Sequence, residues 1–180
     1  MSIIRNKIKT FEILFYNRLC MLMPNYPEHR VIYCFFEGIR QFAWKRMFLS
    51  YGNKSYIRSG TNIVGHQNIT IGDNCLIGPN SIINGANKIF IGDDFLSGPQ
   101  LIIYTSEHGL TNGSIPFRSQ KSKSKEIKIG NNVYIGARVT ILKGVIIGNN
   151  VIIATGSVVN KNIPSNQVWG GVPAKKLKCF

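Results

Sequence analysis

The sequence predicts a mainly β protein, a parallel β-helix of hexapeptide repeats preceded by an N-terminal helical segment. Two observations support this prediction. From residue 55 onward, aliphatic residues recur at every sixth position and are usually followed by glycine or another small residue, whereas residues 29–48 show helical spacing. A period of six fits neither the ~3.6-residue helical turn nor the alternation of a strand, and fixed repeats with glycines are typical of solenoids. We therefore expect a helical segment at 1–54, a β-helix at 55–168 and a C-terminal tail at 169–180.

The hexapeptide repeats form two series of aliphatic positions. The first series consists of Ile71, Ile77, Ile83, Ile91, Ser97, Ile103, Ile129, Ile135, Ile141, Ile147, Ile153 and Val159. The second series runs four residues behind and consists of Ile57, Ile63, Ile69, Val133, Val139, Val145 and Val151. Two additional residues interrupt the first series near Lys88. Each hexapeptide supplies one strand and one corner, so three of them close a coil of about eighteen residues, and the coils stack at ~4.8 Å. We expect the aliphatic residue that opens each repeat to point inward.

The N-terminal segment is expected to be helical. Apolar residues in 29–48 follow i, i+3, i+4 spacing, and PNYPEH at 24–29 separates this helix from an earlier helical run near 4–22. The apolar stripe consists of Ile32, Phe35, Phe36, Ile39, Phe42, Ala43 and Met47, and the basic residues beside it are Arg30, Arg40, Lys45 and Arg46. We interpret the segment as a cap packed on the main body. The alternative is a basic amphipathic surface that contacts the inner face of an anionic membrane.

Length and composition indicate one sizeable globular domain in the cytoplasm. A chain of 180 residues can bury a substantial core. The four cysteines form no CxxC pair, which favours reduced thiols over a disulfide framework or a zinc site. The N-terminal residues are basic and apolar, but charges interrupt each apolar run, and no run reaches the ~18 residues of a membrane span. We expect a cytoplasmic protein, with peripheral contact at the inner membrane face as a variant of that prediction.

The formal net charge of +14 predicts an anionic partner. Nucleic acid, an anionic membrane face and a phosphate-rich cofactor would all fit. The sequence contains no helix-turn-helix, zinc-finger or RNA-recognition signature, so we expect no nucleic-acid partner. The basic residues are spread over the N-terminus, residues 118–125 and residues 175–178, so a solvated surface accounts for many of them.

Residues 109–126 interrupt the hexapeptide series without a strand period of their own. A segment of this length without regular structure, inside a compact domain, is usually a functional loop. The loop begins directly after His108. Its basic residues are Arg118, Lys121, Lys123 and Lys125.

Three stretches of the chain resemble the hexapeptide-repeat acyltransferases, whose repeats wind into a left-handed β-helix. These are GPQLIIYTSEHG at 98–109, IGNNVYIGARVTILKGVIIGNNVIIATGSVVNKNIP at 129–164 and WGGVPAKKLK at 169–178. The first is similar to the segment that bears the catalytic histidine of sugar O-acetyltransferases, and the others to the last coils and the closing segment of the family. The resemblance implies an acetyltransferase that uses acetyl-CoA as co-substrate. It also implies a homotrimer whose active sites lie between neighbouring subunits, with the long loop reaching across to cover the site.

The resemblance assigns roles to individual residues. It implies that His108 is the general base, a role that suits histidine because its unperturbed pKa lies near 6.5. Coenzyme contacts are implied, from the reactive end toward the phosphates, at Ala137, Thr155, Asn160, Lys161, Lys175 and Lys178. Asn80 matches a substrate-binding asparagine of the galactoside and maltose acetyltransferases, but Gly78 stands where those enzymes carry another asparagine. This departure and the long SIPFRSQ loop favour the branch that modifies polysaccharides and their lipid-linked precursors.

The expected function is therefore O-acetylation of a sugar hydroxyl in a surface polysaccharide or its precursor. N-acetylation of an amino-sugar nucleotide or an antibiotic is the nearest alternative, and a non-catalytic scaffold is a further one. A metal-dependent hydratase on this fold needs three convergent histidines, and the chain has only His29, His66 and His108, so we expect no metal. We interpret His66 as a corner residue and Trp169 as either a packing residue or a platform for adenine. Glu107 is expected to point away from its neighbour His108, because adjacent strand residues alternate.

Overall fold

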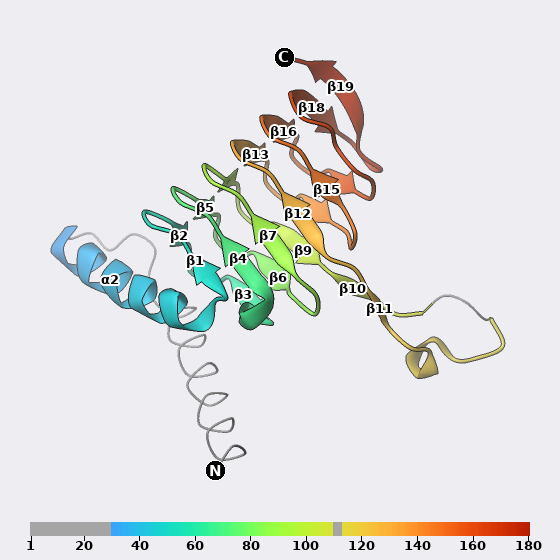
Figure 1. Ribbon diagram of the computed structural model, residues 1–180, viewed down its shortest axis with the longest axis horizontal. Coiled ribbons are helices and arrows are strands. Elements are labelled where there is room, and N and C mark those ends of the chain that lie inside the picture. The colour runs from blue at the N-terminus through green and yellow to red at the C-terminus, as the bar shows by residue number, and fades with distance from the viewer. Residues whose placement is uncertain (1–29, 110–112) are drawn as a thin grey trace, which may run out of the picture.

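Short parallel strands stack on three faces of a solenoid, and a helix lies across the end at which the solenoid begins (Figure 1). The computed structural model describes residues 30–109 and 113–180, and their side chains from residue 38 onward. The expected helical run at 4–22 and the proline segment at 24–29 lie outside the described residues. The predicted fold class is confirmed, because the described chain is mainly β, with a parallel solenoid behind an N-terminal helix.

Each face of the solenoid is one sheet of parallel strands. Face 1 consists of β1 (Ser50–Tyr51), β4 (Ile69–Ile71), β7 (Ile89–Ile91), β12 (Ile127–Ile129) and β15 (Ile146–Ile147). Face 2 consists of β2 (Tyr56–Ile57), β5 (Leu76–Ile77), β8 (Leu96–Ser97), β13 (Val133–Ile135), β16 (Val151–Ile153), β18 (Gln167–Gly170) and the antiparallel β19 (Lys175–Cys179). Face 3 consists of β3 (Asn62–Val64), β6 (Ile82–Asn84), β9 (Ile102–Tyr104), β14 (Thr140–Ile141) and β17 (Val158–Val159).

The remaining elements lie outside these three sheets. They are the helix α2 (Arg30–Met47), the 3-10 helices η1 (His66–Asn68) and η2 (Phe117–Ser119), and the antiparallel pair β10 (Ser106–Glu107) and β11 (Lys123–Ser124). The pair β10–β11 projects from the solenoid at the corner between face 3 and face 1, which we call the loop corner (Figure 1).

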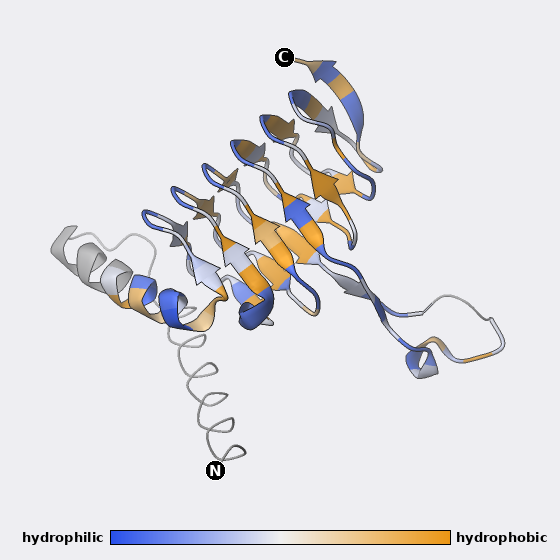
Figure 2. Cartoon of the chain, in the orientation of Figure 1, coloured by the Kyte–Doolittle hydropathy of each residue, from blue (hydrophilic) through white to orange (hydrophobic). Residues whose placement is uncertain are grey.

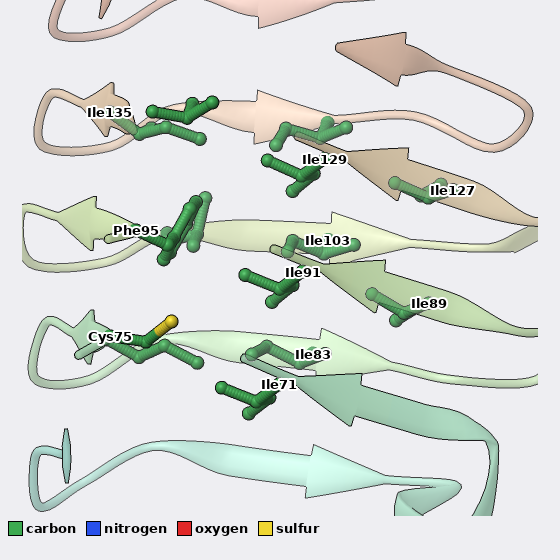
Figure 3. Packing of buried hydrophobic residues seen from close by; sticks show 14 of the residues in the cluster. Ile71, Cys75, Ile83, Ile89, Ile91, Phe95, Ile103, Ile127, Ile129 and Ile135 are labelled. Atoms are coloured by element: carbon green, nitrogen blue, oxygen red, sulfur yellow. The ribbon is translucent and has the colours of Figure 1, made fainter. Parts of the chain in front are cut away.

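Both aliphatic series point into the solenoid and form its core (Figure 3). The register pairs Ile71 with Ile91 and Ile91 with Ile129, so equivalent side chains of successive coils lie directly above one another. Ile83 and Ile103 stack in the same way on face 3. Each such residue is buried, and burying a side chain of this size contributes roughly 1.5 to 3 kcal/mol. The predicted inward orientation of the repeat residues is confirmed.

The first coils are longer than we expected. Ser50 pairs with Thr70, which makes a coil of twenty residues, whereas Lys128 pairs with Ile146, which makes a coil of eighteen. The two additional residues lie at the loop corner, where the first coil contains η1 and the second contains the predicted interruption near Lys88. The expected length of eighteen therefore holds for the coil that directly follows the long loop, whereas the last coil, in which Ile147 pairs with Ile163, has sixteen residues.

The strands of the solenoid extend beyond residues 55 and 168. Tyr51 takes the inward position below Ile71, and Gly52 follows it as glycine follows the later repeats, so β1 is the first rung of face 1. Because Tyr51 is aromatic, the aliphatic pattern of the sequence did not reveal this repeat. At the other end, β18 pairs in parallel with β16 and continues face 2 by one more rung.

The corner between face 1 and face 2 is closed by glycine and by amide or carboxylate side chains, and we call it the glycine corner. A Cβ atom at Gly92 would collide with the side chain of Asn131 in the next coil. The backbone N–H of Asp73 donates to Oδ1 of Asp93 at 2.8 Å, and the N–H of Asp93 donates to Oδ1 of Asn131 at 2.9 Å. Side chains from each following coil thus satisfy backbone donors that would otherwise lack a partner.

Helix α2 packs on the first coil through a face that differs from the predicted stripe. Ala43 and Trp44 are buried, and so is Arg40, whereas Phe42 of the stripe is 57% exposed. The guanidinium carbon of Arg46 lies 5.6 Å from the centre of the Phe42 ring, on the side away from the core. The packing of Ala43 and Trp44 supports the interpretation of α2 as a cap. None of the described helices combines the length and hydropathy needed to cross a membrane.

His66 is the corner residue that we predicted, and it lies where helix and solenoid meet. Its ring stacks on Trp44 with the ring centres 6.0 Å apart, and Phe48 meets it edge-on at 5.5 Å. Burial lowers the pKa of His66 from 6.5 to about 4, because the imidazolium form would lose its hydration. The folded protein therefore holds His66 in its neutral form at pH 7.

Replacing an inward aliphatic residue should destabilise the protein far more than replacing its outward neighbour. Ile147 is 2% exposed, and Ile146, the preceding residue of β15, is 47% exposed. We expect Ile147→Ala to lower the free energy of unfolding by about 2 to 5 kcal/mol, because the substitution leaves a cavity in the stacked core. The matched Ile146→Ala change should cost roughly 0.5 kcal/mol or less. Urea unfolding followed by circular dichroism checks this, and equal losses would contradict the assigned orientations.

The buried His66 should make stability depend on pH. Its pKa is about 4 when folded and ~6.5 when unfolded, so between these values the unfolded state binds the additional proton. Its contribution is complete above ~6.5 and is lost as the pH falls toward about 4, to a total of roughly 3 kcal/mol. His66→Gln should remove this part of the pH dependence. Urea unfolding near pH 7 and near pH 4.5, at one protein concentration, measures it, and an unchanged slope in the variant would refute the assignment.

Candidate active site

His108 follows strand β10 at the loop corner, directly before the long loop. Its side chain is exposed, and no hydrogen bond within the described residues fixes its ring. A substrate can therefore reach the imidazole of His108, in contrast to the buried ring of His66. This position is compatible with the general base that the sequence predicts.

The carboxylate of Glu107, the residue before His108, forms an ion pair with a lysine. Its Oε1 atom lies 2.7 Å from Nζ of Lys143, which belongs to the loop corner of the next coil. Lys143 was not among the residues singled out in the sequence, because its partner lies across the long loop and only the three-dimensional register brings the two together.

The long loop leaves the solenoid as a two-stranded ribbon, and polar residues predominate in it (Figure 2). In the antiparallel pair, Ser106 lies opposite Ser124 and Glu107 lies opposite Lys123. The two segments remain in contact beyond the strands, because a Cβ atom at Gly109 would lie 2.8 Å from the carbonyl oxygen of Lys121. The part of the loop next to His108 is therefore a defined ribbon.

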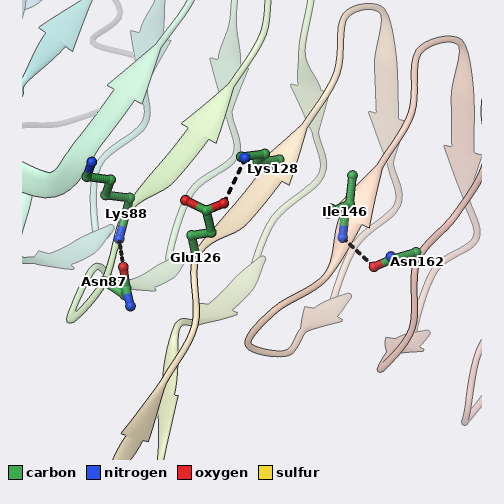
Figure 4. Close-up of polar contacts among 6 residues, drawn as sticks. All are labelled: Asn87, Lys88, Glu126, Lys128, Ile146 and Asn162. Carbon is green, nitrogen blue, oxygen red and sulfur yellow. Dashed lines mark hydrogen bonds and ion pairs between the residues drawn. The ribbon is translucent and has the colours of Figure 1, made fainter.

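The described outer part of the loop is solvent-exposed, and an exposed ion pair lies at its return to face 1. Ile115 and Phe117 are both exposed among the polar residues of the described part of the loop. Where the chain re-enters the solenoid, Oε1 of Glu126 lies 2.7 Å from Nζ of Lys128 (Figure 4). The side chains of Ile115 and Phe117 are thus available for contact with a neighbouring molecule.

The corner between face 2 and face 3, which we call the proline corner, carries two backbone N–H groups that donate to none of the described residues. Pro79, Pro99, Ala137 and Thr155 occupy equivalent positions of successive coils, as the hydrogen bond from the N–H of Gly156 to the carbonyl oxygen of Ala137, 2.8 Å long, illustrates. Proline has no N–H group, and the N–H groups of Ala137 and Thr155 have no acceptor among the described residues. At the glycine corner the corresponding donors are capped by side chains. The coils above Pro99 therefore present two adjacent unpaired donors.

Gly78 and Asn80 lie at the same corner, below Ala137. A Cβ atom at Gly78 would collide with the carbonyl oxygen of Gly98, so close packing of the coils accounts for this glycine. Asn80 has a φ of +57°, a conformation that asparagine adopts more readily than most residues. The departure at Gly78 thus combines the loss of a polar side chain with close packing against the next coil.

The other predicted coenzyme contacts lie near the C-terminus. Asn160 and Lys161 are exposed at the loop corner, and Nζ of Lys161 lies 5.5 Å from the centre of the Trp169 ring. Lys175 and Lys178 are exposed on β19, the outermost strand of face 2. The four side chains are accessible to an anionic ligand.

Trp169 packs into the end of the core. It is 7% exposed, pairs in register with Ile153, and donates from Nε1 to Oε1 of Gln167 at 2.8 Å. Of the two interpretations that the sequence left open, this burial supports packing.

Apart from the two lysines of β19 on face 2, the predicted site residues lie at two different corners of the chain. His108 and Lys161 are at the loop corner, whereas Asn80, Ala137 and Thr155 are at the proline corner, with face 3 between them. One chain does not bring His108 together with the unpaired N–H groups.

No cluster of three potential metal ligands is found in the described ranges 30–109 and 113–180. His66 is buried at the first coil and His108 is exposed beside the loop. His29 lies outside the described residues.

Two family models match the chain. The model described as bacterial transferase hexapeptide (six repeats) matches residues 126–161, and the model described as hexapeptide repeat of succinyl-transferase matches residues 68–94.

Individual relatives match more of the chain. Escherichia coli K12 WbbJ, named as a lipopolysaccharide biosynthesis O-acetyl transferase, is 31% identical over 143 residues, which cover 79% of this chain and 66% of WbbJ. The crystal structure of a maltose O-acetyltransferase from Clostridium difficile 630 is 30% identical with a TM-score of 0.80, and the match covers 95% of this chain and 87% of that one. The Vibrio cholerae acetyltransferase VCA0836, complexed with acetyl-CoA, is 26% identical with a TM-score of 0.80, covering 93% and 85%.

The matches differ in the share of each relative that they cover. The chain spans 66% of the length of WbbJ and 64% of the length of a galactoside O-acetyltransferase from Escherichia coli K12, which is 33% identical, so it covers just under two thirds of each curated relative. The maltose enzyme is matched over nearly its whole length at 30% identity. The chain therefore belongs to the hexapeptide-repeat acyltransferase family, in its sugar O-acetyltransferase branch.

Proposed function

We propose that the protein is an acetyl-CoA-dependent O-acetyltransferase that modifies a sugar hydroxyl of a surface polysaccharide or its precursor, with His108 as general base. The observation that carries this proposal is the exposed imidazole of His108 at the start of the long loop, where no hydrogen bond with the described residues engages it, on a solenoid of the acetyltransferase family. The names of the relatives, which include a maltose and a lipopolysaccharide O-acetyltransferase, support the sugar hydroxyl as acceptor.

The chemistry requires a base of moderate pKa. The sugar oxygen attacks the thioester carbon while its proton passes to a nitrogen of His108, and the carbon–sulfur bond then breaks. The proton held on the imidazolium can pass to the departing sulfur, which returns His108 to its neutral form. A positioned base of this kind contributes roughly a hundredfold to ten-thousandfold in rate.

The unpaired N–H groups of Ala137 and Thr155 support the predicted binding of acetyl-CoA at the proline corner. Backbone donors held by a rigid corner stabilise an oxygen that becomes negative, and one such donor is worth about 3 kcal/mol. Beyond them, Lys175 and Lys178 would pair with the coenzyme phosphates. This pairing would account for part of the positive net charge of the chain. Asn160 and Lys161 lie at the loop corner, so they would reach the arm of the coenzyme from the neighbouring subunit.

A homotrimer would unite the two corners. His108 of one subunit would face the Ala137 and Thr155 donors of its neighbour, because face 3 separates these groups within one chain. Face 3 also carries exposed apolar side chains suited to an interface: Val64, Ile82 and Tyr104. The loop, with its exposed Ile115 and Phe117, would extend over the neighbouring subunit.

Asn80 is the proposed contact to the acceptor at the proline corner. Without an asparagine at Gly78, the site would hold the sugar with fewer polar contacts than a small soluble sugar needs, which favours an acceptor that is held along more of its length. We place the reaction in the cytoplasm, where acetyl-CoA and glycan precursors are available. Contact of the basic N-terminal segment with the inner membrane face stays a prediction.

Removing the proposed base should abolish acetyl transfer. The protein is incubated with acetyl-CoA and a set of acceptors that includes maltose, a galactoside and lipopolysaccharide or capsule fragments, and the released thiol is measured. We expect His108→Ala to lower kcat by roughly a hundredfold or more. Thr70→Ala, on face 1, is the control and should keep wild-type activity. Full activity of the alanine variant would show that another group takes the proton.

Proline at position 137 should remove one N–H donor without disturbing the corner. Pro79 and Pro99 already occupy equivalent positions in the coils below, each after a glycine, and Gly136 precedes Ala137. We expect Ala137→Pro to weaken acetyl-CoA binding, measured by calorimetry, by roughly fivefold to tenfold, the usual value of one hydrogen bond. Its urea unfolding curve should match the wild type.

The control for this experiment is the reverse change, Pro79→Ala, which adds an N–H donor below the proposed coenzyme contacts. It should leave acetyl-CoA affinity unchanged. If Ala137→Pro binds acetyl-CoA as tightly as the wild type, the coenzyme does not use this donor.

A further inference from the structure

The two faces of the β10–β11 ribbon carry different side chains. Ser106 and Ser124 are paired, and so are Glu107 and Lys123. The N–H of Lys125 donates to the carbonyl oxygen of Thr105 at 2.9 Å, which continues the same ladder into the solenoid. Because adjacent strand residues point to opposite faces, Glu107 shares one face with Lys123, and the serines occupy the other. The alternation assigns His108, two residues after Ser106, to the serine face.

The face that carries Glu107 is fastened to the next coil. Oε1 of Glu107 lies 2.7 Å from Nζ of Lys143, whose side chain is only 19% exposed. Beside this ion pair, the aliphatic stem of Lys125 covers Gly144, where a Cβ atom would lie 2.9 Å from Cδ of Lys125. Partial burial of the lysine reduces the screening of this ion pair by salt, and the Glu107 side chain remains 48% exposed. Two neighbouring residues of one corner thus hold this face of the ribbon.

The serine face is fastened to the preceding coil. Nδ2 of Asn87 donates to Oγ of Ser124 at 3.2 Å. The ribbon is therefore held between two coils, with His108 on the side of the preceding one. A ladder this short is marginal by itself, so its direction depends on these attachments.

We infer that the Glu107–Lys143 ion pair is a positioning device for His108. It fixes the ribbon from the side opposite to the imidazole, so that the ring is held at one height along the solenoid without touching either charged group. Glu107 and Lys143 are thus positioning residues, since neither contacts the reacting atoms. The inference rests on the proposed function of His108, because a base must be placed within about 1 Å of its working position to act efficiently.

A double-mutant cycle tests the inference. Glu107→Gln and Lys143→Met each remove one charge and keep most of the side chain. In the full-length protein, labelled with carbon-13 at histidine Cε1, the His108 signal is identified by its loss in His108→Ala. We expect each single variant to shift or broaden this signal and to lower kcat by about tenfold to a hundredfold, with less than about a twofold change in KM for acetyl-CoA. The double variant should lose no more than either single variant, because both changes break the same ion pair.

Two further variants separate positioning from general stability. Lys143→Arg keeps the charge and should retain the wild-type signal and most of kcat. Glu126→Gln breaks the neighbouring Glu126–Lys128 ion pair at the end of the loop and should leave both readouts unchanged. An unaltered His108 signal in either single variant, or additive losses in the double variant, would overturn the inference. The spectra need no acceptor, so a failure to detect acetyl transfer would count against the proposed function and still leave the positioning measured.

Discussion

The in-register stacking of inward side chains holds every coil at the strand spacing of its neighbours. Ile91 can lie directly above Ile71 only if the corners that join the strands have the same shape in each coil. That requirement explains the collision that any Cβ at Gly92 would cause, and it explains why side-chain amides cap the backbone of the glycine corner. It also produces the unpaired donors of the proline corner. Identical corners align the N–H groups of Ala137 and Thr155 in one column, and the prolines below them cannot extend it.

The loop corner is where the solenoid relaxes this requirement. It accepts two additional residues in the first two coils and then the long loop, and in the last coil it is two residues shorter. Strand pairing on the three faces is unaffected, because each insertion begins and ends at the same corner. An exposed histidine at such an insertion can be placed by local contacts without disturbing the core. His108 occupies that position, whereas His66, also at the loop corner, was recruited into the contact with α2.

The sequence was sufficient for those features that repeat. The six-residue period predicted the inward positions, its interruption predicted the long loop, and the i, i+3, i+4 spacing predicted the helix at 29–48. Each of these predictions rests on many residues. Features that depend on a single position could not be predicted in this way. Phe42 fits the apolar stripe of α2, but the buried face is set by the first coil, so Arg40 is buried instead. The Glu107–Lys143 ion pair joins residues on either side of the loop and required the register of the ribbon. The roles assigned to the site residues come from family resemblance and stay predictions.

The division of the site between two corners follows from the shape of a solenoid. Side chains at different corners of a triangular coil point away from each other, so a different rotamer cannot bring the ring of His108 to the N–H groups of Ala137 and Thr155. A second copy can, if it places its proline corner against the loop corner of the first. Assembly would then serve to complete a catalytic site in addition to covering apolar surface. It would also explain why the ribbon is fastened on both sides. A base that acts on a substrate held by another subunit depends on its own ribbon for its position, because its own chain does not hold the substrate beside it.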